Sequence, residues 1–324
     1  MRSAPGYGGP PAGPEATAGP GRPGPGPGRR SFAGHRWTAL AFVAPLVAYL
    51  ALFYAYPLYR NIDLSIHDYT PRAFVQGDAD FTGLANLTGV LASDAFGAAL
   101  WNTAVFTLVS IAAQYAIGLA LAVFFRDNFP LSPLLRAMFL VPWLLPMIVS
   151  ASTWSWMLNS ENGIVNSVLG AFGVGQVNWL TSPETALASV IIANVWLGIP
   201  FNLVILYSGL QNIPRDLYEA AELDGAGPWQ RFRHITMPLL RPVSVITLLL
   251  GLVYTLKVVD VIWIMTLGGP GNTSTTLAIW SYRRAFGTGQ PDFSEAAAVG
   301  NLLILMALVF GFVHLYLRRR EEWS

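Results

Sequence analysis

The sequence predicts an all-α polytopic membrane protein with six transmembrane helices. Of the 324 residues, 53% are hydrophobic and only 11% are charged, a composition unlike that of soluble domains. The apolar residues come in six blocks, each long enough to cross roughly 30 Å of hydrocarbon as a helix of about 20 residues. The predicted spans are 37–57, 99–125, 134–157, 186–209, 243–265 and 296–317.

The chain before the first span is rich in Pro, Gly and Arg. Residues 1–36 hold too little aliphatic side chain to bury a core, which predicts a disordered cytoplasmic tail. The segment does not resemble a signal peptide, because the apolar run that follows it is too long and no small-residue cleavage site closes it. The predicted domains are this tail, a membrane domain over 37–320 and a short cytoplasmic end over 321–324.

Aromatic residues mark the ends of the first three spans. Trp37 and Tyr54 flank the first span, and Trp101 lies at the start of the second. Trp154 and Trp156 lie at the end of the third. Such amphipathic rings prefer the headgroup region, so their positions support these span limits.

The fourth span contains helix-breaking residues, and the sixth ends at an aromatic residue. Trp196, Gly198 and Pro200 predict an interrupted fourth helix of the kind found at transport sites. Tyr316 closes the sixth span at the expected interface.

The spans also carry charged and amide side chains. Lys257 and Asp260 lie three residues apart in the fifth span, where an unpaired charge costs at least about 2.5–3.5 kcal/mol. We expect either a local salt bridge on one helix face, or contact with the solute or a neighbouring subunit. Gln114, Asn194 and Asn202 leave a similar choice between solute contacts and interhelical hydrogen bonds.

Arginine distribution predicts the orientation. The chain has a single lysine among its 19 basic residues. By the positive-inside rule, the loops richer in arginine are cytoplasmic, which places both termini inside. The arginines on the predicted inner side are Arg2, Arg22, Arg29, Arg30, Arg36, Arg126, Arg136, Arg215, Arg231, Arg233, Arg241, Arg318, Arg319 and Arg320, and those on the outer side are Arg60, Arg72, Arg283 and Arg284.

The largest predicted cytoplasmic loop, 211–242, has the pattern of two short helices. Pro214 and Asp216 are typical of a helix start, and Gly225 is typical of a helix end. A second short helix is predicted to carry Trp229, Phe232 and Ile235 on one stripe, before two prolines lead into the fifth span. The loop should therefore form a firm projection beneath the membrane.

The spacing of this loop resembles the EAA signature of binding-protein-dependent ABC importer permeases, over ten matched positions. FTGLANL at 81–87 and MTLGGPGNTSTTL at 265–277 resemble, more weakly, the carbohydrate-uptake branch and its F-type maltose permease subunit. The resemblance covers 37–320 and implies the type I permease fold. The ten signature residues are Glu219, Ala220, Ala221, Asp224, Gly225, Ala226, Phe232, Ile235, Pro238 and Pro242.

The resemblance implies a permease subunit in the bacterial inner membrane. It would form half of the path for a sugar delivered by an extracytoplasmic sugar-binding protein, with a second related permease and a dimer of ABC ATPases as partners. The loop would dock in a cleft of the ATPase, with Glu219 engaging a basic residue there and Gly225 making the turn. Asn202, Lys257 and Asp260 then become candidates for the translocation path.

The composition gives no sign of catalysis in this chain. There is no cysteine, the four histidines are scattered, and a metal site is not expected. A phosphate-binding loop of the Walker type needs a lysine, and Lys257 is in a span. We therefore expect a non-catalytic subunit that binds no cofactor, ATP and Mg²⁺ being used by the partner ATPase, and the net charge of +1 indicates no nucleic acid.

Three other functions stay open on the sequence. The solute could be a polyol or a glycerol phosphate instead of a sugar. An ion-coupled secondary transporter would use Lys257 and Asp260 for coupling, but it has no need of the EAA loop. A membrane-embedded enzyme would need a clustered nucleophile, metal set or carboxylate pair in the spans, which the sequence lacks.

Overall fold

A computed structural model describes residues 32–127, 129–287 and 289–321, and the single residue 9. Side chains are described from residue 41 to residue 312 within these ranges. The predicted disorder of residues 1–8 and 10–31 and the predicted cytoplasmic end 322–324 thus lie outside the described residues. For residues 32–36 the predicted disorder is wrong, because they form the start of α1, and Glu321 is the last residue of α15.

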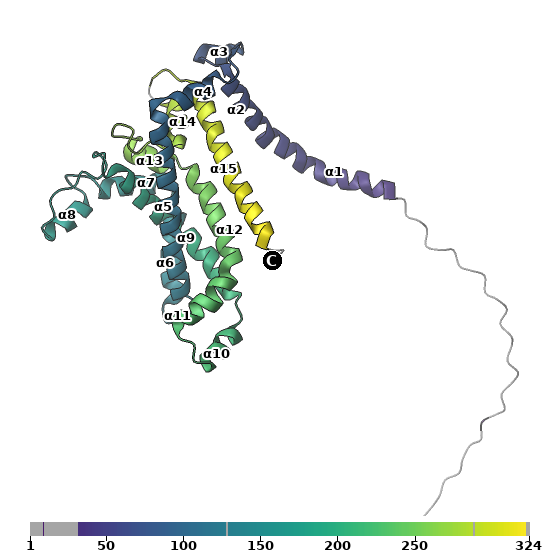
Figure 1. The fold of residues 1–324 in the computed structure, drawn as a ribbon, viewed down its shortest axis with the longest axis vertical. Helices are drawn as coiled ribbons and strands as arrows, with labels where there is room; N and C mark the ends of the chain where they lie inside the picture. Colours follow the sequence, from purple (N-terminus) through teal and green to yellow (C-terminus); the bar gives the residue numbers. More distant parts are fainter. Residues whose placement is uncertain (1–8, 10–31, 128, 288, 322–324) are drawn as a thin grey trace, which may run out of the picture. The chain divides into compact units, whose positions relative to one another are not determined.

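The chain divides into two compact units between Tyr56 and Pro57 (Figure 1). In the first unit, α1 (Phe32–Leu50) is followed by the π-helical turn η1 (Ala51–Ala55). The second unit holds the remaining elements, beginning within α2. They are α2 (Tyr56–Ile66), β1 (His67–Asp68), α3 (Pro71–Gln76), β2 (Asp80–Phe81), α4 (Ala85–Ala92), α5 (Asp94–Phe124), α6 (Ser132–Leu144), α7 (Met147–Met157), α8 (Ile164–Ala171), α9 (Ala186–Gln211), α10 (Arg215–Leu223), α11 (Pro228–Arg231), η2 (Phe232–Thr236), α12 (Met237–Leu256), α13 (Asp260–Thr266), α14 (Leu277–Phe286) and α15 (Phe293–Glu321).

The described residues confirm a helical membrane protein. Apart from the two-residue antiparallel pair β1–β2, the elements are helices. Five helices are long and apolar enough to cross a membrane, and a sixth span is present if the bent pair α6–α7 counts as one. The candidate spans are 41–66, 94–124, 132–157 with the bend, 186–211, 228–256 and 293–312.

The predicted third span, 134–157, is not one straight helix. α6 and α7 meet at an angle of 96°. The reason is local: proline disfavours helical geometry in the residue before it, and Leu145, which precedes Pro146, is extended with φ −77° and ψ 142°. Pro142 lies inside α6 without ending it.

The predicted C-terminal end of the fifth span, 243–265, is also wrong. α12 stops at Leu256, and α13 begins at Asp260. The β-branched Val258 and Val259 between them favour helix less than most residues, and an acidic residue is stabilised at a helix start. Lys257 and Asp260 therefore do not share a helix face, which corrects the prediction.

The predicted interruption of the fourth span is wrong as well. α9 runs from Ala186 to Gln211 with Pro200 inside it. Gly198 has a packing role instead: a Cβ atom there would lie 2.2 Å from Cδ of Gln114 in α5. The glycine lets the two helices approach closely and does not break α9.

α5 and α9 form the axis of the second unit. Gln114 lies beside Gly198, and Gly118 lies so close to Asn202 that an added Cβ would be 2.5 Å from the Asn202 Cβ. Gln114 precedes Gly118 in α5, and their partners Gly198 and Asn202 follow in the same order in α9. The two helices therefore run in the same direction, as the second and fourth spans of a membrane protein must.

Two buried clusters lie along this axis. One, around Phe106, Val190 and Ile262, joins α5 and α9 to α7 and α13. The other, around Phe125, Leu206 and Leu240, lies at the opposite end and joins α5 and α9 to α10 and α12.

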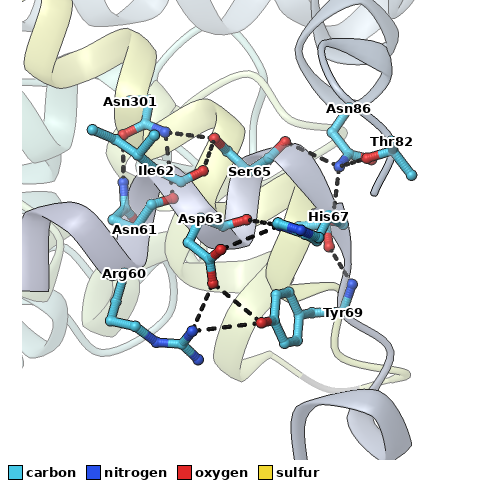
Figure 2. A network of polar contacts seen from close by, with 11 residues as sticks. Arg60, Asn61, Ile62, Asp63, Ser65, His67, Tyr69, Thr82, Asn86 and Asn301 are labelled. Atoms are coloured by element: carbon cyan, nitrogen blue, oxygen red, sulfur yellow. Dashed lines mark hydrogen bonds and ion pairs between the residues drawn. The ribbon is translucent and has the colours of Figure 1, made fainter. Parts of the chain in front are cut away.

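The first span is longer than predicted, because α2 continues the helix beyond residue 57 to Ile66. A polar network holds α2 against α15 (Figure 2). Asn61 Nδ2 donates to Asn301 Oδ1 at 2.6 Å, and Asn301 Nδ2 donates to Ser65 Oγ at 2.9 Å. Asn86 Nδ2 extends the network by donating to the backbone oxygens of Ser65 and His67, both at 3.0 Å.

Candidate functional site

The EAA loop (211–242) and the loop around Gly268, Gly269 and Pro270, here called the GGP loop, lie at opposite ends of α5 (Figure 1). Near the start of α5, Asn102 Nδ2 donates to the backbone oxygens of Asn272 and Thr275, at 3.2 and 3.1 Å. Just beyond its end, Arg126 contacts Tyr218 of α10. α5 has 31 residues and is therefore about 46 Å long at 1.5 Å per residue, which exceeds the hydrocarbon thickness of about 30 Å.

The first helix of the loop forms as the sequence predicts. α10 begins after Pro214 and ends at Leu223, and Gly225 adopts φ +78°. The Ala226 amide donates to the Ala221 oxygen at 2.8 Å, and the Gly225 amide donates to the Glu222 oxygen at 3.0 Å. This is the Schellman end of a helix, which favours glycine because its φ is positive.

The second helix of the loop is not separate from the fifth span, contrary to the prediction. α11, η2 and α12 form one candidate span from Pro228 to Leu256. Pro238 would clash with the carbonyl four residues earlier in an ideal α-helix. The π-helical turn just before it, in which the Met237 amide donates to the Phe232 oxygen, contains one more residue per hydrogen-bonded turn. Pro242 lies further along, inside α12.

Glu219 and Glu222 differ in their contacts, although both line a cavity of about 370 Å³ beside α10. Glu222 forms an ion pair with Arg231. Glu219 is exposed, and within the described part of the chain no hydrogen bond or ion pair is recorded for it. The carboxylate of Glu219 is therefore available to a group from outside this chain.

The outer side of the loop is partly apolar. The exposed fractions are 44% for Leu217, 91% for Leu223 and 69% for Trp229. Ala220 is exposed and Ala221 half-buried, so small side chains lie among the large ones. A second concavity, of about 360 Å³, is lined by Ala221, Asp224, Gly225, Ala226, His234 and Ile235.

The inner side of the loop packs on the membrane helices. Phe232 and Ile235 contact the buried cluster around Phe125 and Leu240. Tyr218 belongs to that cluster and is 6% exposed. The sequence prediction did not single out Tyr218; the available signal was an aromatic residue immediately before Glu219 in a predicted surface helix.

A second candidate site lies between α5, α6, α9 and α12. It is a cavity of about 310 Å³, to which Gln114, Asn194, Lys257 and Asp260 all contribute. Gln114 Nε2 donates to the Asn194 backbone oxygen at 2.9 Å, and the buried Asn194 Nδ2 has no hydrogen-bond partner in the protein. An unpaired buried amide is a donor for a ligand or for water.

Asn202 does not belong to this cavity. Its side chain is 3% exposed, and its Nδ2 donates to the Gly198 oxygen at 2.9 Å. It lies in the contact between α5 and α9 beside Gly118. Of the two roles left open by the sequence, interhelical packing is the one its contacts fit.

Lys257 and Asp260 each lie at a helix end. Lys257 follows the last residue of α12 and Asp260 is the first residue of α13. A cation at a helix C-terminus and an anion at an N-terminus both interact favourably with the helix dipole. The Lys257 ammonium lies 5.1 Å from the Tyr254 ring centroid, and no ion pair to Asp260 is recorded in the described part of the chain.

Aromatic rings complete the cavity, and the sequence prediction missed them. Phe201 lies 6.4 Å from Trp143 and 5.8 Å from Tyr254 between ring centroids, both edge to face. All three residues line the cavity. Rings with a few polar groups among them are the usual lining of small-molecule sites. Among the described residues no three His, Asp or Glu side chains gather where they could hold a metal ion.

Comparison with known proteins identifies relatives of the chain. Residues 114–322 match the family described as "Binding-protein-dependent transport system inner membrane component". A trehalose/maltose transport system permease protein of Thermococcus litoralis is 36% identical over 278 residues, which cover 86% of this chain and 92% of that protein. A lactose transport system permease protein of Rhizobium radiobacter is 34% identical and covers 87% and 94%, respectively.

A solved structure shares the fold. In the crystal structure of a bacterial ABC transporter involved in the import of the acidic polysaccharide alginate, one chain superposes on this one with a TM-score of 0.75. The sequence identity is 23%, and the match covers 89% of this chain and 96% of that chain.

Proposed function

The chain belongs to the family of binding-protein-dependent transport system inner membrane components, and from this membership we propose that it forms half of a sugar's path across the membrane. It is a multi-pass inner-membrane permease subunit of an ABC importer, and it is not an enzyme. ATP is hydrolysed by a separate ATPase subunit.

A sugar as the cargo is supported by two observations. The relatives include permeases named for trehalose/maltose and for lactose transport. The cavity between α5, α6, α9 and α12 combines aromatic rings with amide, ammonium and carboxylate groups, which suit the apolar faces and the hydroxyl groups of a sugar ring. Lys257 and Asp260 are the candidate path residues that this cavity supports, whereas Asn202 is not.

The proposed assembly contains a second related permease, a dimer of ATPases and an extracytoplasmic sugar-binding protein. Six spans with both termini in the cytoplasm fit the arginine distribution. In this orientation the EAA loop faces the cytoplasm, where the ATPase lies, and the GGP loop faces the binding protein. The opposite placement of these loops on α5 supports this arrangement.

The loop over 211–242 is proposed as the joint with the ATPase, and the unpaired Glu219 is the observation that carries this role. A surface glutamate without a partner can form a charge-assisted bond with a basic residue of another subunit, which is roughly twice as strong as a neutral hydrogen bond. The exposed Leu217, Leu223 and Trp229 of the same loop supply the apolar area that a stable interface needs.

The test compares two glutamates of the same helix. Glu219→Gln removes the unpaired charge, and Glu222→Gln removes a charge already paired with Arg231 within the loop. We expect Glu219→Gln to weaken ATPase binding roughly tenfold or more, because hydrogen bonds to charged groups contribute about 1.5–3 kcal/mol. Glu222→Gln should change it less. The measurement is the ATPase that copurifies with the affinity-tagged permease over a range of ATPase concentrations.

Reversal of the charge sharpens this test. Glu219→Lys should abolish copurification of the ATPase while insertion of the permease into the membrane stays normal, because the side chain is exposed and lies outside the candidate spans. If Glu219→Lys binds the ATPase and supports uptake as well as the wild type does, the proposed joint is wrong.

A further inference from the structure

We infer that Tyr218 is the positioning residue that fixes the coupling helix α10 to two membrane spans at once, so that α10 cannot move without α5 and α12. The inference rests on the proposed coupling role of the 211–242 loop. It assigns to Tyr218 and its partners the transmission of movement, as distinct from the binding of the ATPase.

Two different interactions converge on the Tyr218 ring and hydroxyl. The guanidinium carbon of Arg126 lies 3.8 Å from the ring centroid, well within the distance of about 6 Å at which a cation is attracted to an aromatic face. The Tyr218 hydroxyl is 2.9 Å from Thr236 Oγ1, with which it shares a hydrogen bond. Tyr218 is 6% exposed and Thr236 3%, so their hydrogen bond is shielded from water. In the cation–π pair the ring is buried, whereas the Arg126 side chain is 30% exposed.

The partners of Tyr218 belong to two separate spans. Arg126 follows the last residue of α5 by two positions. Thr236 is the last residue of η2 and leads directly into α12. One side chain of α10 is thus bonded to the inner end of the second span through its ring face and to the inner end of the fifth through its hydroxyl.

Tyr218 and Glu219 are neighbours on α10 but have different surroundings and different proposed roles. Consecutive residues of an α-helix point about 100° apart, so Tyr218 and Glu219 face different surroundings. Tyr218 is buried against the spans, and Glu219 is exposed beside the cavity. Force applied by a partner at Glu219 has a short, shielded path through Tyr218 into the membrane helices.

The test measures the coupling ratio, which is the number of sugar molecules imported per ATP hydrolysed. The whole importer is reconstituted in liposomes with maltose, trehalose or lactose, whichever of the three stimulates its ATPase. Tyr218→Phe keeps the ring and removes the hydrogen bond to Thr236. Arg126→Gln removes the cation and keeps a side chain of similar polarity.

Each variant should lower the coupling ratio about fivefold, since each removes one interaction of ordinary strength between α10 and a span. The ATPase should still copurify, because Glu219 is intact. Arg126→Lys should recover most of the ratio, because a cation again faces the ring. A general loss of folding would instead lower uptake and ATP hydrolysis together and leave the ratio unchanged.

Two control variants remove matching interactions elsewhere. Tyr115→Phe deletes the 2.8 Å hydrogen bond from Tyr115 to Ser244, which also joins α5 to α12 but does not touch α10. Arg136→Gln deletes a cation over the Tyr207 ring, at 4.8 Å, between α6 and α9. Both should leave the coupling ratio at the wild-type value.

The outcomes separate this inference from the proposed function. If Tyr218→Phe and Arg126→Gln couple normally while Glu219→Lys loses the ATPase, the loop is a joint but Tyr218 does not transmit its movement. If the controls lower the ratio as much as the two test variants do, the effect belongs to any contact between spans and the inference is overturned. If Glu219→Lys is normal, the proposed joint itself fails.

Discussion

At the scale of single residues, small side chains decide how closely the spans pack. Gly118 of α5 lies against the backbone of α9: a Cβ at this position would be 2.5 Å from Asn202 Cβ and 3.1 Å from the Leu203 amide nitrogen. Backbone atoms in the middle of a packed helix cannot move aside as a flexible side chain can. The contact therefore requires glycine.

We predict that Gly118→Ala destabilises the protein by about 1–3 kcal/mol, the usual cost of adding a methyl group to a filled space. The control is Gly97→Ala in the same helix, where no atom lies within 4 Å of the added Cβ. The fraction of each variant that stays folded in detergent after heating gives the comparison. Equal stability of the two variants would show that α5 and α9 are further apart than described.

The charges of the membrane cavity give a second prediction at this scale. Lys257→Met and Asp260→Asn should each lower sugar uptake about tenfold at saturating binding protein, because each removes a charged hydrogen-bonding group from the proposed path. The amount of ATPase that copurifies should not change. Glu184→Gln is the control: this exposed carboxylate, whose pKa is lowered by the hydrogen bond from Ser182, is not among the residues that line the cavity. Normal uptake by both variants would remove these residues from the path.

At the scale of elements, helix ends decide the shape of the loop over 211–242. α10 ends because Gly225 adopts φ +78°, a conformation that costs other residues about 1–2 kcal/mol. Asparagine tolerates it best, and β-branched residues tolerate it least.

We therefore predict that Gly225→Val weakens ATPase copurification while Gly225→Asn stays close to the wild type. No atom lies within 4 Å of an added Cβ at this position, so the contrast isolates backbone conformation from side-chain clash. Equal copurification by the two variants would mean that the positive φ has no part in docking.

Element boundaries also show what the sequence could and could not predict. The end of α10 was predictable, because a single glycine sets it by local chemistry. The break at Leu145 was not, because Pro142 and Pro200 lie inside helices that continue, so a proline alone does not reveal where a span bends. The contact of Arg126 with Tyr218 could not be predicted either, since it depends on how the ends of helices far apart in the sequence come together.

Hydropathy predicted the approximate place of the apolar helices, since burial in lipid needs only length and composition. It could not predict that the helix of the fifth span starts at Pro228, because residues 228–236 include several polar and charged side chains. Hydropathy also could not show which amides line the cavity. Asn194 and Asn202 lie on the same helix, but only Asn194 lines the cavity, whereas Asn202 packs against Gly118 of α5.

At the scale of the whole molecule, the orientation can be tested without background labelling, because the chain has no cysteine. We predict that cysteine at exposed position Glu161 reacts with a membrane-impermeant thiol reagent in intact cells. Cysteine at Leu223, which is 91% exposed, should react only after permeabilisation. Labelling of Leu223→Cys from outside would invert the topology and remove the proposed contact with the ATPase.

The energy source gives the last prediction at this scale. Proteoliposomes containing the whole importer should take up maltose, trehalose or lactose only with ATP on the ATPase side and binding protein on the other. A proton or sodium gradient without ATP should give no uptake above that of empty liposomes. Uptake driven by an ion gradient alone would contradict the function.

The unbroken helix from Pro228 to Leu256 acts geometrically as a lever. Its 29 residues give a rod of about 44 Å, with the proposed ATPase joint at one end and the cavity residue Lys257 just past the other. A tilt of roughly 5° about the inner end would carry the outer end about 4 Å sideways, on a rod of this length. A displacement of that size exceeds the radius of a water molecule and approaches the width of a sugar ring. A small rotation at the joint would therefore suffice to open or close the passage, with no helix needing to unfold.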